Sequence, residues 1–210
     1  MTFSIFDIPE DKARAMIDSG VWSRNCPVKM QDLRLLELLY CDFDGAERQG
    51  ELVVHHAIAD DVIIIFRDLY HQQFPIQQMV TMDQFHGSDD ESMRANNSSC
   101  FNNRMIKGTD KYSLHSYGLA IDINPVQNPC ISFDKQGGAL GGALGGACIE
   151  PARGQEFVSR NNQRPGMVEP VVDIFKKNGF EIWGGQWNDP VDYHHFQVSR
   201  DKLEHVLNLA

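Results

Sequence analysis

Two clusters of polar side chains, far apart in the sequence, carry the residue types of a metal-dependent hydrolytic site. His115 and Asp122 lie seven positions apart in the first cluster, and Asp192 and His195 lie three positions apart in the second. Imidazole nitrogen and carboxylate oxygen atoms are ligands that Zn²⁺ binds in proteins. A catalytic zinc needs three protein ligands, an open position for water and a base that takes the proton of that water. Together the two clusters supply three ligands and a spare carboxylate.

The segment between His115 and Asp122 must bend if both side chains are to reach one metal ion. Residues 120–124 read AIDIN, where apolar side chains alternate around Asp122 as in a half-buried strand. On one straight strand, residues seven positions apart point to opposite faces. A bend at Gly118 would bring the two side chains together, so we expect a turn there, followed by a strand.

The second cluster leaves a choice of ligand open, because His194 stands next to His195. In a strand, neighbouring side chains face opposite ways, so only one of the two histidines could then bind the metal.

The elements that must position these clusters follow from apolar periodicity and turn residues. We expect helices over 9–19, 58–69, 167–178 and 200–209, strands over 33–43, 51–56, 76–82, 180–183 and 195–198, a turn over 44–50 and a long polar loop over 83–110. Helices come early and late, with antiparallel strands between them. This order predicts an α+β fold, a single small domain with an antiparallel sheet and flanking helices, over residues 1–210.

A four-residue repeat interrupts this pattern, because residues 137–148 read GGALGGALGGAC. Glycine at this density favours neither a helix nor a strand, so we expect a flexible Gly-Ala-Leu insertion near 135–150. A phosphate-binding loop is disfavoured, since no Lys-Ser or Lys-Thr pair follows the glycines.

Composition narrows the function classes further. The 210-residue chain has 29 acidic and 19 basic residues, a formal net charge of -10, which argues against a nucleic-acid binder. No apolar run approaches the ~18 residues of a membrane span. Residues 1–14 lack the cationic and apolar regions of a signal peptide. This leaves two alternatives open: a protein that stays inside the cell, or an exported protein whose signal has been removed. The five cysteines contain no C-x-x-C pair, so a thiolate zinc cluster is not expected.

The chain resembles the zinc D-alanyl-D-alanine peptidases, a family that includes vancomycin-resistance dipeptidases and carboxypeptidases and phage L-alanyl-D-glutamate endolysins. The family pattern is S-x-H-x-x-G-x-A-x-D, followed far downstream by an acid-x-x-H. Every fixed position is matched, by Ser113, His115, Gly118, Ala120, Asp122, Asp192 and His195. The residues WGGQW at 183–187, NP at 124–125 and NNSSCFNNR at 96–104 also look like this family, and the resemblance covers roughly residues 30 to 198.

The resemblance implies a hedgehog/DD-peptidase-like fold with one Zn²⁺ per chain, held by His115, Asp122 and His195. It implies that Asp192 is the general base and that Arg104 steadies the scissile carbonyl or a substrate carboxylate. Ser113 would contact the substrate. Trp183 could line the floor of the substrate groove, with a place in the core as the alternative.

The implied activity is hydrolysis of a D-amino-acid-containing peptide bond in a peptidoglycan peptide, either as a D,D-carboxypeptidase or as an L-Ala-D-Glu endopeptidase. The alternative is a non-catalytic, zinc-stabilised binding domain for cell wall or protein on the same fold. Serine hydrolysis is a weak third reading, because the sequence has no G-x-S-x-G turn to expose a nucleophile.

Overall fold

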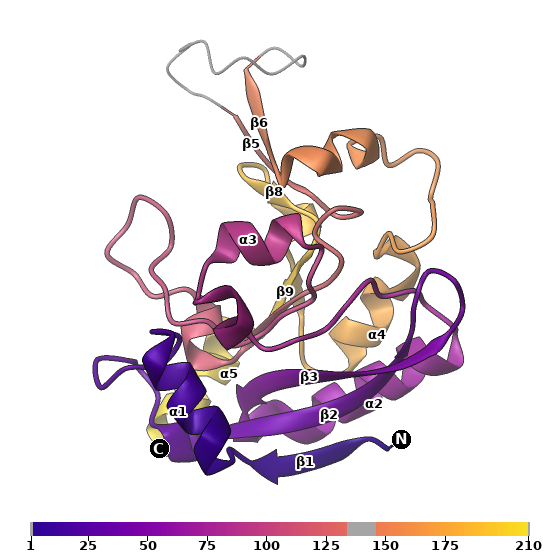
Figure 1. Ribbon diagram of the computed structural model, residues 1–210. Helices are drawn as coiled ribbons and strands as arrows, with labels where there is room; N and C mark the ends of the chain where they lie inside the picture. The colour runs from indigo at the N-terminus through magenta and orange to yellow at the C-terminus, as the bar shows by residue number, and fades with distance from the viewer. Residues whose placement is uncertain (1, 134–145, 210) are drawn as a thin grey trace.

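The computed structural model describes residues 2–133 and 146–209 and confirms a mixed fold of helices and antiparallel sheets (Figure 1). The helices are α1 (Glu10–Asp18), α2 (Ala59–His71), α3 (Asp89–Arg94), α4 (Val172–Lys177) and α5 (Arg200–Leu209). The strands are β1 (Ser4–Asp7), β2 (Leu33–Cys41), β3 (Glu47–His55), β4 (Ala120–Asp122), β5 (Cys130–Phe133), β6 (Ala147–Glu150), β7 (Ile182–Trp183), β8 (Val191–Asp192) and β9 (His195–Gln197). No helix within these described ranges is long and apolar enough to cross a membrane.

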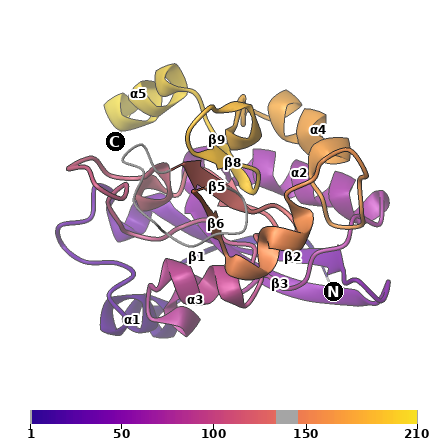
Figure 2. The ribbon, with the colours of Figure 1, turned by 90° about the horizontal axis from the view of Figure 1, so that it is seen from above.

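The first sheet, in the order β1-β2-β3, forms the base of the fold. Its central strand is covered on both faces: Leu36 and Leu38 pack in the core that contains α2, and Leu33 and Leu35 pack in a second cluster with Met16 of α1. The two helices lie on opposite sides of this sheet, as the view from above also shows (Figure 2). Burial on both faces explains why the apolar run over 33–43 lacks a clear two-residue period.

The second sheet, in the order β4-β9-β7, stands above the first and carries the candidate site. Asp122 of β4 lies directly opposite His195 of β9. On its other side, β4 exchanges two backbone hydrogen bonds with Ser99, of 3.0 and 2.8 Å. The backbone around Asp122 is therefore held from both sides.

The third sheet, in the order β6-β5-β8, extends away from the base (Figure 1). In it β5 pairs with β8, so that Cys130 lies opposite Asp192. The predicted Gly-Ala-Leu insertion falls largely on residues 134–145, outside the described residues. Its last four residues, 147–150, are not an insertion loop but form β6 against β5.

The strand predicted over 76–82 is absent. Side-chain amides bind the backbone of this segment: Gln77 N–H donates to Asn124 Oδ1 (3.0 Å) and Val80 N–H donates to Asn97 Oδ1 (2.9 Å).

Three further predicted elements have other bounds in the structure. The turn predicted over 44–50 is shorter, since β3 begins at Glu47. The loop over 83–110 contains α3. The helix predicted over 167–178 is α-helical from Val172 only; it follows a 3₁₀ turn at Glu169–Val171 that contains proline, which cannot donate a helical hydrogen bond.

Candidate metal centre

His115 lies on a single 3₁₀ turn, Leu114–Tyr117, whose two ends fix its direction. At the start, Ser113 Oγ accepts a hydrogen bond from the His115 backbone N–H (3.3 Å). At the end, Gly118 adopts the left-handed conformation, with φ 66°. The bend predicted at Gly118 is thereby confirmed, and the chain runs on into β4.

Gly118 also lies against the end of β3, with no room for a side chain. A Cβ atom at this position would stand 2.7 Å from the backbone nitrogen of His55. The same His55 N–H donates a hydrogen bond to the Gly118 carbonyl (3.0 Å). The turn that carries His115 is thus held against β3 of the first sheet by this hydrogen bond and by close packing.

Three side chains converge on one point from this turn, from β4 and from β9. His115 Nε2 lies 3.1 Å from Asp122 Oδ2, and His195 Nδ1 lies 3.0 Å from Asp122 Oδ1. The two imidazole nitrogens are 3.2 Å apart. All three side chains are buried, and their ligand atoms lie within 4.8 Å of one another. The sequence-predicted ligands are therefore together, in an arrangement that could hold a metal ion.

The outward nitrogens of the two imidazoles decide which atoms face the centre. His115 Nδ1 lies 2.5 Å from the Cys100 carbonyl oxygen, and His195 Nε2 lies 2.9 Å from Gln197 Oε1. Both of these oxygens are acceptors, so each outward nitrogen carries the hydrogen and each inward nitrogen presents a lone pair. Two lone pairs and a carboxylate then point at one buried spot, where a cation would relieve their repulsion. This nitrogen and oxygen donor set fits Zn²⁺.

The charges of the group follow from burial and mutual contact. Burial alone would raise the pKa of Asp122, but His115 and His194 outweigh it and hold the Asp122 pKa well below its usual range. Burial opposes protonation of His195, yet the neighbouring Asp122 carboxylate raises the His195 pKa. The carboxylate of Asp122 is thus ionised and ready to act as a ligand.

Asp192 lies at the end of β8, beside this group but outside the three ligands. Burial raises the pKa of its carboxyl. Within the described part of the chain, its Oδ1 atom has no aligned hydrogen-bond donor, although His194 Nε2 stands 3.0 Å away. A Cβ atom on Gly184 would lie 2.4 Å from the Asp192 carbonyl oxygen, so glycine at 184 allows β8 to pass closely.

His194 and His195 do not face opposite sides, because His194 belongs to a turn between β8 and β9 and not to a strand. His194 Nε2 lies 4.0 Å from Asp122 Oδ2, so both histidines approach the same carboxylate. The convergent ligand group nevertheless contains His195 and not His194.

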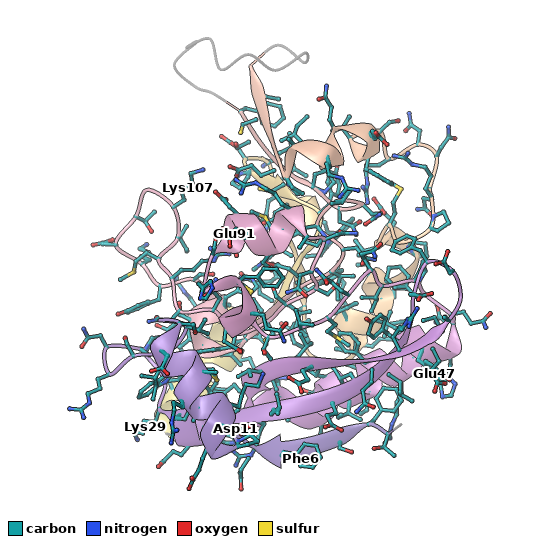
Figure 3. All side chains as sticks on the ribbon, viewed as in Figure 1. Phe6, Asp11, Lys29, Glu47, Glu91 and Lys107 are labelled. Atoms are coloured by element: carbon teal, nitrogen blue, oxygen red, sulfur yellow. The ribbon has the colours of Figure 1, made fainter. Side chains whose placement is uncertain are left out.

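Arg104 lies on a segment that runs beside the His115 turn. Its backbone N–H donates to Ser116 Oγ (2.9 Å), and its carbonyl accepts from the Ser113 N–H (3.1 Å). Its guanidinium pairs with Asp89 of α3 (Nη2 to Oδ2, 3.1 Å), while its Nε is buried and has no hydrogen-bond partner among the residues that the structure describes. Figure 3 labels Glu91 on α3 and Lys107, which follows Arg104 by three residues in the chain.

The other two predicted substrate contacts have identifiable structural partners. Ser113 is buried and caps the His115 turn. Trp183 is half-buried, donates from Nε1 to the Tyr193 carbonyl (2.9 Å) and stacks on Phe196 of the core. Trp187 lies beside one candidate ligand, with its ring centroid 5.3 Å from that of His195.

Two residues that hold the candidate ligands escaped prediction from the sequence. Gln197 stands two positions after His195 on the same strand face, a spacing that could have identified it. The carbonyl group of Cys100, which faces His115, and that of Asn128, which faces His194, gave no such signal, because any residue type can supply a backbone oxygen.

Residues 107–198 match the family model for D-alanyl-D-alanine carboxypeptidase. The matched segment contains the three candidate ligands and Asp192, whereas Arg104 precedes it. The match supports a peptidase of this family for the part of the chain that carries the site. The chain gave no match among curated proteins or solved structures.

Proposed function

We propose that the protein is a zinc-dependent metallopeptidase that hydrolyses a D-amino-acid-containing peptide bond in peptidoglycan peptides. The bond is either the terminal one, as for a D,D-carboxypeptidase, or an internal L-Ala-D-Glu bond. The observation that carries this proposal is the buried convergence of His115, Asp122 and His195, inside a segment that matches a carboxypeptidase family.

In this proposal His115 Nε2, a carboxylate oxygen of Asp122 and His195 Nδ1 hold one zinc ion. When bound, zinc supplies Lewis-acid polarisation of a carbonyl group and a lowered pKa of water. The chain's part is to keep the two inward nitrogens unprotonated, which the Cys100 carbonyl and Gln197 do by accepting hydrogen bonds on the far side of each ring.

Asp192 is the proposed general base. Its carboxylate takes a proton from the attacking water and passes it to the leaving amine. Burial raises the pKa of Asp192, which makes the ionised carboxylate a stronger base than an exposed aspartate. Because Asp192 is not one of the converging ligands, its carboxylate is available for this proton transfer.

Arg104 is the proposed electrostatic partner of the substrate, where its guanidinium would offset negative charge on the scissile carbonyl or bind a carboxylate. Its backbone is fixed to the His115 turn, so the side chain starts from a defined position. Asp89 is its partner in the structure, and a substrate oxygen would share or replace that contact. Substrate contacts by Ser113 and Trp183 stay predictions.

The test is mass spectrometry of defined peptidoglycan peptides after incubation with the zinc-loaded protein. We expect new peptide termini with the unchanged protein, whose masses identify the bond. Asp192→Asn should bind zinc but lose turnover by about 10²- to 10⁴-fold, the usual worth of a general base. His195→Ala should lose zinc, and His205→Gln, on the exposed face of α5, is the matched control that should alter neither.

Two outcomes would contradict the assignment. Intact peptides in the presence of one bound zinc per chain would favour the non-catalytic binding domain. An Asp192→Asn protein as active as the unchanged one would remove Asp192 from the mechanism.

A further inference from the structure

The third sheet carries a row of side chains that leads away from Asp192, the proposed base. Its middle strand β5 places Cys130 directly opposite Asp192 of β8 on one side and directly opposite Glu150 of β6 on the other. Residues that lie directly opposite one another in antiparallel strands point to the same face of the sheet. The three side chains therefore share one face, and two strand spacings set the backbones of Asp192 and Glu150 about 10 Å apart.

This face of the third sheet is the one that the candidate metal centre occupies. The Asp192 carboxylate lies 3.0 Å from His194 Nε2, and the same nitrogen lies 4.0 Å from the candidate ligand Asp122. The thiol of Cys130 lies among these groups, since its pKa is raised by burial and then by three carboxylates, those of Asp192, Glu150 and Asp122. The row thus runs from the metal centre through Cys130 to Glu150.

Exposure increases along this row, from the proposed base to the far end. The side chain of Asp192 is 16% exposed, whereas that of Glu150 is 35% exposed. Glu150 can therefore bind a group that arrives from solvent, while the pairing of β8, β5 and β6 fixes its distance from Asp192.

The chemical group that Glu150 binds in the structure is an ammonium. Lys107 Nζ lies 3.3 Å from Glu150 Oε1, and the Lys107 side chain, labelled in Figure 3, is 90% exposed. Because Lys107 follows Arg104 by three residues, this pair joins the segment of Arg104 to the row that contains Asp192. An ion pair this exposed is weak, since water and salt compete for both charges. An ammonium group of a bound peptide can therefore replace Lys107 on Glu150.

We propose that Glu150 is a specificity-determining residue, which binds a free primary ammonium group of the substrate peptide and has Lys107 as its partner when no substrate is bound. Three extended residues span about 10 Å, so the ammonium belongs to a residue within about three positions of the bond that is cut. Two sources present such a group: the side chain of a diamino acid such as lysine, and the N-terminus of a short peptide. This inference rests on the proposed function, in which the scissile bond lies at Asp192.

Three forms of one peptide distinguish the two sources. The probe is the pentapeptide L-Ala-D-Glu-L-Lys-D-Ala-D-Ala, which contains both candidate bonds. It is used with both amines free, with the lysine side chain acetylated, and with the N-terminus acetylated. The measured quantity is kcat/KM for each form, with the unchanged protein, Glu150→Gln and Lys107→Ala. Glu204→Gln, on the exposed face of α5, is the matched control.

Acetylation of the amine that Glu150 binds should lower kcat/KM by about 5- to 10-fold, as for a charge-assisted hydrogen bond that is partly exposed to solvent. Acetylation of the other amine should have little effect, which identifies the source. In Glu150→Gln the preference for the free amine should disappear. In Lys107→Ala it should increase by about 2-fold, because a competing ammonium is gone. Glu204→Gln should keep the preference of the unchanged protein, and added salt should weaken that preference.

The results separate this inference from the proposed function. Equal cleavage of all three forms by the unchanged protein overturns the ammonium site and leaves the peptidase assignment standing. The same conclusion follows if Glu150→Gln loses an equal factor on the free and the acetylated forms, since that loss is structural.

If no form is cleaved, the proposed function falls, and calorimetric titration of the three forms into the zinc-loaded protein decides the inference. Tighter binding of a free-amine form, lost in Glu150→Gln and kept in Glu204→Gln, supports the ammonium site. Equal binding of all forms, or no binding, overturns it.

Discussion

Replacing Gly118 by alanine tests whether the turn beneath His115 is set by the backbone. The residue has φ 66°, a conformation that costs an L-amino acid about 1 kcal/mol or more. In addition, the new Cβ would meet the His55 backbone nitrogen at 2.7 Å and the Val54 carbonyl carbon at 3.1 Å. Neither atom can move alone, because both belong to β3 and His55 is paired with Leu33 of β2.

The expected loss of stability has two parts. The conformational part is about 1 kcal/mol, and forcing an atom into packed backbone adds about 1–3 kcal/mol, for a total of about 3 kcal/mol. In a chain of this size such a loss lowers Tm by about 6–12 °C. We also expect zinc affinity to fall by about 10-fold or more, because His115 is displaced from Asp122.

Gly20→Ala is the matched control, since Gly20 has φ 78° but a Cβ added there would have no atom of the described residues within 4 Å. It should lower Tm by only about 2–4 °C, as expected for about 1 kcal/mol, and leave zinc affinity unchanged. Thermal unfolding followed by circular dichroism, with chelator competition for zinc, measures both quantities. A Gly118→Ala protein as stable and as zinc-bound as Gly20→Ala would refute the argument that the turn cannot shift.

Three further perturbations give distinct outcomes. Removing zinc with a chelator should lower Tm and abolish turnover. Zinc at 1,000 times its Kd should then raise the free energy of unfolding by about 4 kcal/mol, which thermal unfolding with and without metal measures. An unchanged Tm would count against the buried ligand group. Burial lowers the pKa of His55 to about 4 in the folded protein, whereas the same imidazole in the unfolded chain titrates at about 6.5. As pH falls between these two values, the unfolded chain binds a proton that the folded protein does not, so the free energy of unfolding decreases. His55→Asn keeps an acceptor for the Ala57 N–H and should lose less stability over that range in urea titrations, whereas equal slopes for the two proteins would exclude His55 as a source. Gly184→Ala would press a methyl group against the Asp192 carbonyl and should reduce kcat while zinc remains bound; loss of zinc instead would show that β8 supports the ligands themselves.

Within each cluster the spacing of the candidate ligands is local information, since a short bend at Gly118 links His115 to Asp122 and a single turn links Asp192 to His195. That the two clusters form one site was implied by the family resemblance, and the structure brings His115, Asp122 and His195 together. The α+β fold and most helices followed from periodicity, since α2 has one apolar face.

The wrong predictions have a different physical cause, because they concern backbone groups that bind side chains distant in the sequence. Residues 76–82 have the composition of a strand, but amide side chains of Asn97 and Asn124 bind the backbone that a strand would have used. Pairing of this kind depends on residues 17 to 47 positions away. The same applies to the site, where the Cys100 and Asn128 carbonyls hold imidazole rings through atoms common to every residue.

Because Asp122 pairs directly with His195, we expect the candidate metal centre to form late in folding. Its two imidazoles lie 80 positions apart in the chain, and closing so long a loop is slower than forming the local contacts of the base sheet. Before β9 joins β4, the chain offers only His115 and Asp122, and two ligands bind zinc weakly. Zinc uptake during refolding should thus lag behind the recovery of helical signal, so that the metal acts as a natural marker of the final assembly step.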